Sequence, residues 1–229
     1  MRGIVNSANA AFLGLFFGLV KILLLVIVTL AIIVLVKRSH ARIKGVVGER
    51  KTRKILERLP ETYKVINDLL LQTERGTSQI DHTVLSPHGI FVIETKNYWG
   101  WIFGDEHAEY WTQVTYGSKN RFYNPLRQNH GHVQTLKEVL GRSGDVPYYP
   151  VVVFDDGCVL KKVNTTHPVI YQKQLMEFIL DRKREAVLTE KEIDRLYVGL
   201  LAAHCHDREV RRQHAEVIRA KRLHTVIPA

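Results

Sequence analysis

The hydrophobic positions of the chain fall into one long run followed by a series of shorter, periodic stretches. Residues 8–36 are apolar almost without interruption, and only Asn9, Lys21 and Thr29 break the run. A bilayer span needs about 20 such residues, so the run predicts one transmembrane helix near the N-terminus. The later stretches alternate at every second residue or recur at helical spacing, which predicts a folded domain of strands and helices.

Beyond the apolar run, helical and strand-like patterns follow one another in a mixed order. Helical spacing predicts helices over residues 46–59, 124–140, 175–184, 188–205 and 207–222. Alternation and short apolar runs predict strands over residues 62–71, 78–85, 89–96, 110–115, 149–154 and 169–171. This is an α/β order, so we expect one mixed β-sheet flanked by helices and preceded by one N-terminal transmembrane helix.

Several residues mark where these elements begin and end. Asn124 followed by Pro125 suits the cap and the first position of a helix. Thr189, with Glu192 three residues later, suits a capping box. Residues 86–89 form a Ser-Pro-His-Gly turn cluster, so the strands on either side of it are expected to pair as a hairpin.

The long apolar run has a second interpretation, a cleaved signal peptide. Such a peptide has an apolar region of about 7–15 residues and ends at a small-residue cleavage site. This run is longer and is followed by basic clusters over residues 37–44 and 50–54, whereas Arg2 is the only basic residue before it. The positive-inside rule therefore predicts a single-pass protein of the cell membrane, embedded in the lipid bilayer through residues 8–36, with its C-terminal domain in the cytoplasm. Lys21 would either snorkel to the outer interface or face a partner helix.

The composition narrows the function classes without choosing one. Of the 229 residues, 45% are apolar and 24% are charged, which are values of a folded protein and exclude a largely disordered chain. The net charge of +10 suits either nucleic acid or an anionic membrane surface. Cys158 and Cys205 form no CxxC motif, which argues against a zinc ribbon or a thioredoxin-like site. No P-loop motif is present, so ATP hydrolysis is not indicated.

Residues with chemical potential gather on the predicted hairpin. Side chains alternate along a strand, so Glu94 and Lys96 share one face. If Pro87 and His88 form the turn, counting back along both strands pairs Asp81 directly with Glu94, with Cβ atoms about 4.5–5.5 Å apart. A turn longer or shorter by one residue would move one of the two carboxylates to the other face.

The pairing of Asp81 with Glu94 would place two negative charges together, which destabilises a sheet unless a cation compensates them. An Mg²⁺ ion held by one or two carboxylates, with several waters retained, commonly binds substrate phosphates. Asp81 and Glu94 are therefore predicted as ligands of Mg²⁺ or Mn²⁺. Lys96 would orient or deprotonate the attacking water, or stabilise the phosphate. The alternative is a pair of neighbouring strands with ordinary surface salt bridges.

Two helical residues are expected beside the hairpin. Helical spacing within residues 46–59 turns Glu49 toward the core side, although a glutamate near a helix start can also act as a dipole partner. Gln128 lies one turn after the start of the helix over residues 124–140, where its amide can reach a phosphate or a metal-bound water. The candidate catalytic residues are Lys96, Glu94, Asp81, Glu49 and Gln128.

Aromatic and basic residues near the hairpin each allow two interpretations. The aromatic residues either stack on nucleotide bases or pack the sheet; they are Trp99, Trp101, Tyr110 and Trp111. The basic residues either contact phosphates or are ordinary solvated charges; they are Lys119, Arg121, Arg127 and His130.

The order of these motifs resembles that of the nuclease-related domain, a branch of the PD-(D/E)xK nuclease superfamily. The resemblance runs from about residue 45 to residue 140. The motifs that carry it lie at residues 48–49, 79–82, 89–96, 100–104, 111–113 and 124–129. It implies a restriction-endonuclease-like core, with Asp81 and Glu94 as metal ligands and Lys96 as the catalytic lysine. It also implies supporting positions at Glu49 and Gln128.

The resemblance implies metal-dependent hydrolysis of phosphodiester bonds in DNA, or in RNA. The alternative is a membrane-anchored domain that binds nucleic acid or a protein partner without catalysis. The expected division of the chain is a transmembrane helix with its basic flank over residues 1–40, a nuclease-like domain over residues 41–165, and a C-terminal helical extension over residues 166–229.

Overall fold

The computed structural model describes residues 2–141, 145–181 and 184–226, with side chains for 18–35, 47–141, 145–181 and 184–218. The chain separates into two compact units, Met1–Val46 and Val47–Ala229. The C-terminal helices after residue 165 therefore belong to the same compact unit as the strands before them.

The first unit consists of helical chain. Helix α1 runs over Arg2–Leu56 and continues into the second unit. Within it, Gly18–Leu35 has a mean hydropathy of 3.0, and among the described residues this is the helix long and apolar enough to cross a membrane. The hydroxyl of Thr29 donates to the carbonyl oxygen of Leu25, so this polar group is satisfied inside the helix. The basic side chains of residues 37–44 lie outside the described ones.

Two mixed sheets form the second unit. The larger has the order β1-β2-β3-β7-β9 and the smaller the order β6-β5-β4-β8. The larger sheet consists of β1 Lys64–Thr73, β2 Gly76–Ser86, β3 Gly89–Lys96, β7 Tyr148–Phe154 and β9 Val169–Tyr171. The smaller consists of β4 Gly100–Asp105, β5 Tyr110–Thr115, β6 Ser118–Tyr123 and β8 Cys158–Asn164.

The mixed α/β class is therefore confirmed, but the expectation of one sheet is wrong. Three strands of the smaller sheet were not predicted, because they give no strong apolar pattern. The side chains of β6, for example, are exposed at five of its six positions. Within the larger sheet β1, β2 and β3 run antiparallel, and β7 and β9 join them in parallel.

The helices follow the predicted signals closely. They are α2 Pro125–Leu140, α3 Leu175–Ile179, α4 Glu190–Ala203 and α5 Arg208–Val226. The Asn124 side chain accepts from the amide of Leu126 at the start of α2, and Thr189 and Glu192 form the expected capping box of α4. The helix predicted over residues 175–184 ends at Ile179, after a 3₁₀ turn over Gln172–Gln174. Residues 182 and 183 lie outside the described part.

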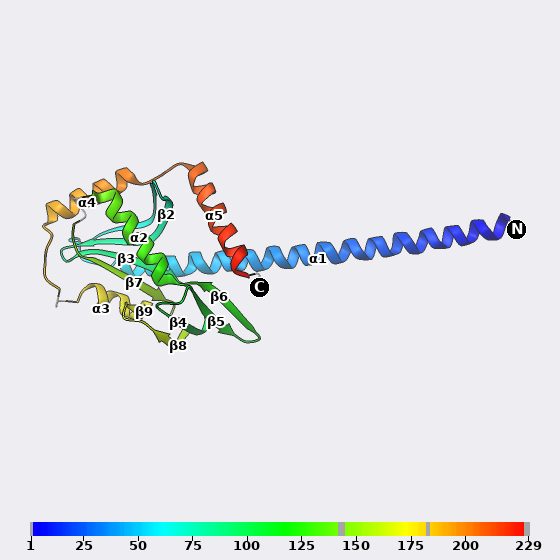
Figure 1. The fold of residues 1–229 in the computed structure, drawn as a ribbon, viewed down its shortest axis with the longest axis horizontal. Coiled ribbons are helices and arrows are strands. Elements are labelled where there is room, and N and C mark those ends of the chain that lie inside the picture. Colours follow the sequence, from blue (N-terminus) through cyan, green and yellow to red (C-terminus); the bar gives the residue numbers. More distant parts are fainter. Residues whose placement is uncertain (1, 142–144, 182–183, 227–229) are drawn as a thin grey trace. The chain divides into compact units, whose positions relative to one another are not determined.

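The larger sheet is buried on both faces. Helices α2 and α4 cover one face, while α3 and the last turns of α1 cover the other (Figure 1). Residues 151–154 of β7 are fully buried, as expected for a parallel strand between two helical layers. Burying each such side chain stabilises the fold by about 1.5–3 kcal/mol, so the middle of this sheet is a rigid support for its strand ends.

The hairpin of β2 and β3 has the register predicted from its turn. Backbone pairing runs from Ser86 with Gly89 to His82 with Ile93. The pairing ends one step before Asp81 and Glu94. There the carboxylate of Asp81 accepts a hydrogen bond from the backbone amide of Thr95 at 2.8 Å. The side chain of Asp81 thus takes the place of a backbone acceptor at the end of the hairpin.

Residues before α5 pair with the edge strand β1. The amide of Leu70 donates to Nδ1 of His204 at 3.1 Å, and the amide of Cys205 donates to the carbonyl of Leu70 at 2.8 Å. Helix α5 also contacts β1 and β2. Its Arg211 forms an ion pair with Asp68 of β1 at 2.7 Å. A hydrogen bond between His214 and Thr77 at 2.8 Å adds to it.

Candidate active site

The predicted carboxylate and lysine meet at the end of β3. Nζ of Lys96 donates to Oε1 of Glu94 at 2.5 Å and to Oε1 of Gln128 at 2.9 Å. Glu94 is buried, with 2% of its side chain exposed, and Lys96 is 15% exposed. Gln128 comes from the second turn of α2, whose start is fixed by the Asn124 cap. Three of the five candidate residues therefore form one hydrogen-bonded group.

A histidine that was not predicted completes this group. Nε2 of His132 lies 3.2 Å from Oε2 of Glu94, and Nδ1 of His132 lies 2.8 Å from the hydroxyl of Ser78. Because an ionised carboxylate only accepts hydrogen bonds, Nε2 of His132 donates to Glu94, while Nδ1 and the Ser78 hydroxyl form a second hydrogen bond. Both oxygens of Glu94 are thus engaged. Helical spacing was the available signal, because His132 lies four residues after Gln128 on α2.

The charges of Glu94 and Lys96 strongly affect each other's pKa. Burial alone would raise the pKa of Glu94, but the charge of Lys96 and the hydrogen bonds from His132 and Lys96 outweigh it and lower this pKa to about 2. Burial alone would lower the pKa of Lys96, but Glu94 and other neighbouring acidic groups outweigh it and raise this pKa. Glu94 is therefore a carboxylate and Lys96 an ammonium ion near neutral pH.

Asp81 is in the opposite situation. Burial and the neighbouring charge of Glu94 raise the pKa of Asp81 well above its ordinary value. The charge of Lys96 and the hydrogen bond from the Thr95 amide oppose this effect without cancelling it. The protein therefore stabilises the ionised form of Asp81 less well than water does, and a further positive charge would be needed to keep this group ionised.

Glu49 lies near the same charges, although its side chain keeps access to solvent. Partial burial, followed by the negative charges of Asp68 and Glu94, raises the pKa of Glu49. Glu49 therefore faces the charged group without being packed in the core; among residues 47–56 the buried positions are Gly48, Thr52 and Leu56. A Cβ atom at Gly48 would lie 2.4 Å from Cβ of Asn97, so only glycine lets the helix approach the end of β3 this closely.

Asp68 is a further acidic residue near the site, and the sequence did not predict it there. It lies across from Asp81 in the pairing of β1 with β2, between the pairs of Asn67 with His82 and Leu69 with Ile80. Its backbone φ of 56° is in the left-handed region, which aspartate tolerates better than most residues. Sequence spacing gave no signal for Asp68, because its position depends on the pairing of β1.

The donor set suits a hard divalent cation with few protein ligands. Among the described residues, no group of three histidine, cysteine or acidic side chains is close enough together to hold a metal ion by itself. Mg²⁺ and Mn²⁺ sites in phosphate-processing proteins often use only one or two carboxylates and fill the remaining positions with water and substrate. The undercompensated carboxyl of Asp81 beside the ionised Glu94 fits that requirement.

The aromatic residues after β3 divide between the two interpretations left open by the sequence. Trp111 is 1% exposed and stacks in parallel on Phe154 at 6.2 Å between ring centroids, so it packs the core. Trp99 and Trp101 are 48% and 50% exposed. Arg121 is exposed on β6, with its guanidinium 4.8 Å from the ring centre of Tyr110.

Comparison with known proteins agrees with the motif order. Residues 44–155 match the family model of the nuclease-related domain. The chain is also 33% identical over 204 residues to an uncharacterized protein of Bacillus anthracis, an alignment that covers 87% of this chain and 95% of that protein. No solved structure matches the chain. The extent of these two similarities shows that the chain belongs to the nuclease-related domain family.

Proposed function

We propose that the chain is a membrane-anchored, divalent-metal-dependent nuclease that hydrolyses phosphodiester bonds of DNA. The observation that carries the proposal is the unequal pair of carboxyl groups in a nuclease-related domain. Glu94 is held ionised by Lys96 and His132, whereas Asp81 has a raised pKa and needs a further positive charge. A divalent cation supplies that charge. Mg²⁺ held by one or two carboxylates commonly binds the phosphate groups of a substrate.

Asp81 and Glu94 would hold Mg²⁺ or Mn²⁺, which when bound activates a water molecule and neutralises charge on the phosphate. Lys96 is an ammonium ion, so we assign it a role as a hydrogen-bond donor to the negatively charged phosphate rather than as a base. Gln128 and Glu94 fix the position of its Nζ atom. His132 and Ser78 hold the carboxylate of Glu94 in one orientation.

The remaining parts of the proposal concern substrate and location. A chain with a net charge of +10 suits a polyanion, and RNA is the alternative to DNA. The apolar helix over Gly18–Leu35, followed by basic residues, supports a single-pass anchor in the cell membrane with the nuclease domain in the cytoplasm. In this proposal, residues 1–40 anchor the protein, residues 41–165 carry the catalytic domain, and residues 166–229 extend it.

The test is cleavage of supercoiled plasmid DNA by the full chain in detergent micelles, with Mg²⁺, Mn²⁺ or EDTA. The informative variant is Asp81→Asn. The asparagine oxygen can still accept from the Thr95 amide, and the substitution removes a half-buried carboxyl group whose charge the fold compensates poorly. The variant is therefore expected to fold as well as the wild-type chain while losing the metal ligand. Lys96→Ala tests the proposed lysine, and Arg58→Ala is a control at an exposed arginine elsewhere.

Metal-dependent cutting by the wild-type chain and the Arg58→Ala variant, but not by folded Asp81→Asn, would support the proposal. A reduction of at least about 100-fold is expected for loss of one such group. If the wild-type chain binds DNA equally in Mg²⁺ and EDTA and never cuts it, the domain is a binding module and the nuclease proposal is wrong. Replacing the plasmid by a structured RNA separates the two substrates.

A further inference from the structure

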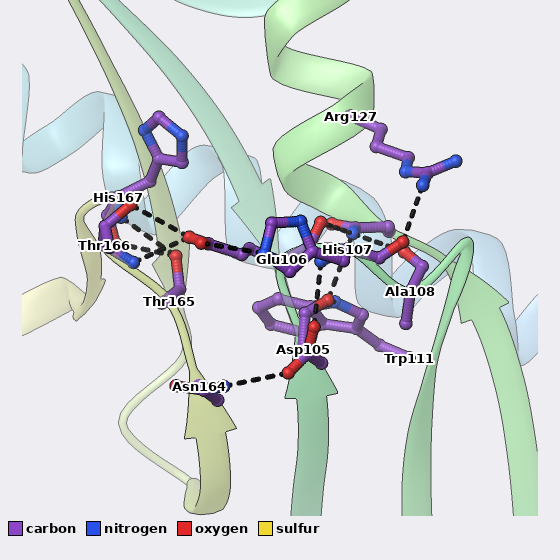
Figure 2. Close-up of polar contacts among 11 residues, drawn as sticks. Asp105, Glu106, His107, Ala108, Trp111, Arg127, Asn164, Thr165, Thr166 and His167 are labelled. Atoms are coloured by element: carbon purple, nitrogen blue, oxygen red, sulfur yellow. Dashed lines mark hydrogen bonds and ion pairs between the residues drawn. The ribbon is translucent and has the colours of Figure 1, made fainter.

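A second group of polar side chains lies on the other side of α2 from Gln128 and His132. It surrounds a pocket of about 280 Å³ whose wall comes from α2, the segment after β4, the start of β7 and the loop before β9. The lining residues are Glu106, His107, Leu126, Arg127, Asn129, His130, Val133, Pro150 and His167. Figure 2 shows Glu106, His107, Arg127 and His167 brought together from three separate segments. We refer to this group as the base pocket.

Hydrogen bonds hold the frame of the base pocket in place. The Asn124 side chain donates to the carbonyl groups of Asp105, Glu106 and Ala108. Arg127 donates to the carbonyl of His107 at 2.6 Å (Figure 2). Oε2 of Glu106 accepts from the amide and the hydroxyl of Thr166 at 2.8 and 2.9 Å. The segment after β4 is thus fixed from two directions, so the pocket is formed before any ligand binds.

The floor and the rim of the base pocket differ in chemistry. Leu126, Val133 and Pro150 give apolar walls, whereas His107, His130 and His167 are exposed imidazoles at the rim. Imidazole rings stack on planar aromatic ligands. The volume lies at the small end of the roughly 300–1,000 Å³ typical of ligand pockets, which suits a single base better than a whole cofactor.

The polar groups of the base pocket restrict the class of ligand that it can bind. Hydrogen bonds from Thr166 lower the pKa of Glu106, so this residue remains a carboxylate and accepts hydrogen bonds. A carboxylate inside the pocket disfavours a bare phosphate. A transition metal is also disfavoured, because no three ligating side chains in the described part of the chain come together. Oε1 of Glu106 lies 3.4 Å from Nε2 of His107, so the carboxylate is beside an imidazole of the same pocket.

An asparagine ties the pocket wall to the larger sheet. Asn129 is 1% exposed, and its Nδ2 donates to the carbonyls of Val92 at 2.9 Å and Val151 at 3.1 Å. These two acceptors fix the orientation of the amide. The wall formed by this turn of α2 is therefore held against β3 and β7.

We propose that the base pocket binds a guanine base. Guanine is the nucleobase that presents two adjacent N–H donors, which suit the Glu106 carboxylate, on a planar ring that fits between apolar walls and imidazoles. The proposal goes beyond phosphodiester hydrolysis, because it concerns recognition away from the carboxylates and lysine of the active site. The base can come from a free nucleotide or from a nucleic-acid strand.

The test is binding to the full chain in detergent micelles with EDTA present, so that no active-site metal contributes. Isothermal titration compares guanosine monophosphate with the adenosine, cytidine and uridine monophosphates. A second series compares a thymidine oligonucleotide containing one guanine with the same oligonucleotide lacking it. Glu106→Gln keeps an acceptor for Thr166 but offers guanine an amide in place of the carboxylate, and His167→Ala removes one exposed ring. Arg58→Ala, at an exposed arginine away from the pocket, is the control that should bind like the wild-type chain.

We expect guanine-dependent binding that weakens by at least about tenfold in Glu106→Gln and more mildly in His167→Ala. Preference among the free nucleotides identifies a free-nucleotide site, and preference among the oligonucleotides alone identifies a base within a strand. Equal binding of all four bases, no binding of either probe, or binding unchanged by Glu106→Gln in a folded variant would overturn the proposal. None of these outcomes depends on whether the chain cleaves DNA.

Discussion

Helix α2 separates two sites that treat charge in opposite ways. Toward β3, Gln128 and His132 contact the partly buried Lys96 and the buried Glu94, whose opposite charges compensate each other. On its other side, Arg127 and His130 line the base pocket, whose charged groups are close to solvent. The first site therefore gains its chemical properties from burial, whereas the second gains its selectivity from a frame of hydrogen bonds. A charge change should affect stability at the first site and recognition at the second.

The largest expected effect comes from replacing one glutamate in each site by glutamine. Glu94→Gln leaves Lys96 buried without its direct partner, and breaking such a pair costs roughly 3–5 kcal/mol of the free energy of unfolding. The lower end of that range is expected, because Asp81 can ionise beside Lys96 in its place. Glu106→Gln should leave the unfolding free energy nearly unchanged. Urea denaturation followed by tryptophan fluorescence measures both, and equal losses would contradict the contrast.

The second prediction concerns pH and separates the two acidic groups by the sign of their shifts. The raised pKa of Asp81 means that the metal-free protein keeps a proton where an ordinary carboxyl has lost it. A cation must displace that proton, so at limiting Mg²⁺ the cleavage rate should rise with pH, by at most about tenfold per pH unit, until Asp81 is ionised. Glu106 has a lowered pKa and adds no such slope. Rates measured over a matrix of pH and Mg²⁺ concentration test this, and a metal requirement that does not vary with pH would refute it.

The smallest effects come from removing one supporting hydroxyl in each site. Ser78→Ala removes the hydrogen bond to His132 and should lower cleavage, whereas Thr166→Val removes one of the two bonds to Glu106 and should weaken guanine binding. Each loss should be roughly two- to tenfold, the range expected for one hydrogen bond. Each variant should leave the other activity unchanged. If either variant alters both activities equally, the two sites are not independent.

Much of the larger sheet follows from local rules of sequence. The turn over residues 86–89 determines the register of β2 and β3, and Asn124 with Pro125 determines the start of α2. Together these place Lys96, Glu94 and Gln128 within hydrogen-bond distance of one another. Asp81 and Glu49 lie near enough to share their electrostatic environment. The catalytic roles of all five residues stay predictions.

The features that were not predicted depend on contacts between distant segments. The base pocket combines Glu106, Arg127 and His167, which no local pattern connects. Asp68 approaches the site only through the pairing of β1 with β2. Strands β4, β6 and β8 of the smaller sheet were not predicted; the side chains of β6, for example, are mostly exposed and give no apolar face. Periodicity reports which side of an element is buried, but it does not report which elements become neighbours.

The pairing of residues 204 and 205 with β1 has a consequence for the solution behaviour of this protein. A free edge strand offers unpaired amides and carbonyls to other chains and promotes aggregation. Here the backbone groups of Leu70 are already occupied by His204 and Cys205. Both residues lie beyond residues 44–155, the part that matches the nuclease-related domain. A shortened protein that ends with the family match would expose the edge of β1, and we expect it to aggregate more readily than the full chain. The C-terminal extension therefore protects the domain against self-association through this edge.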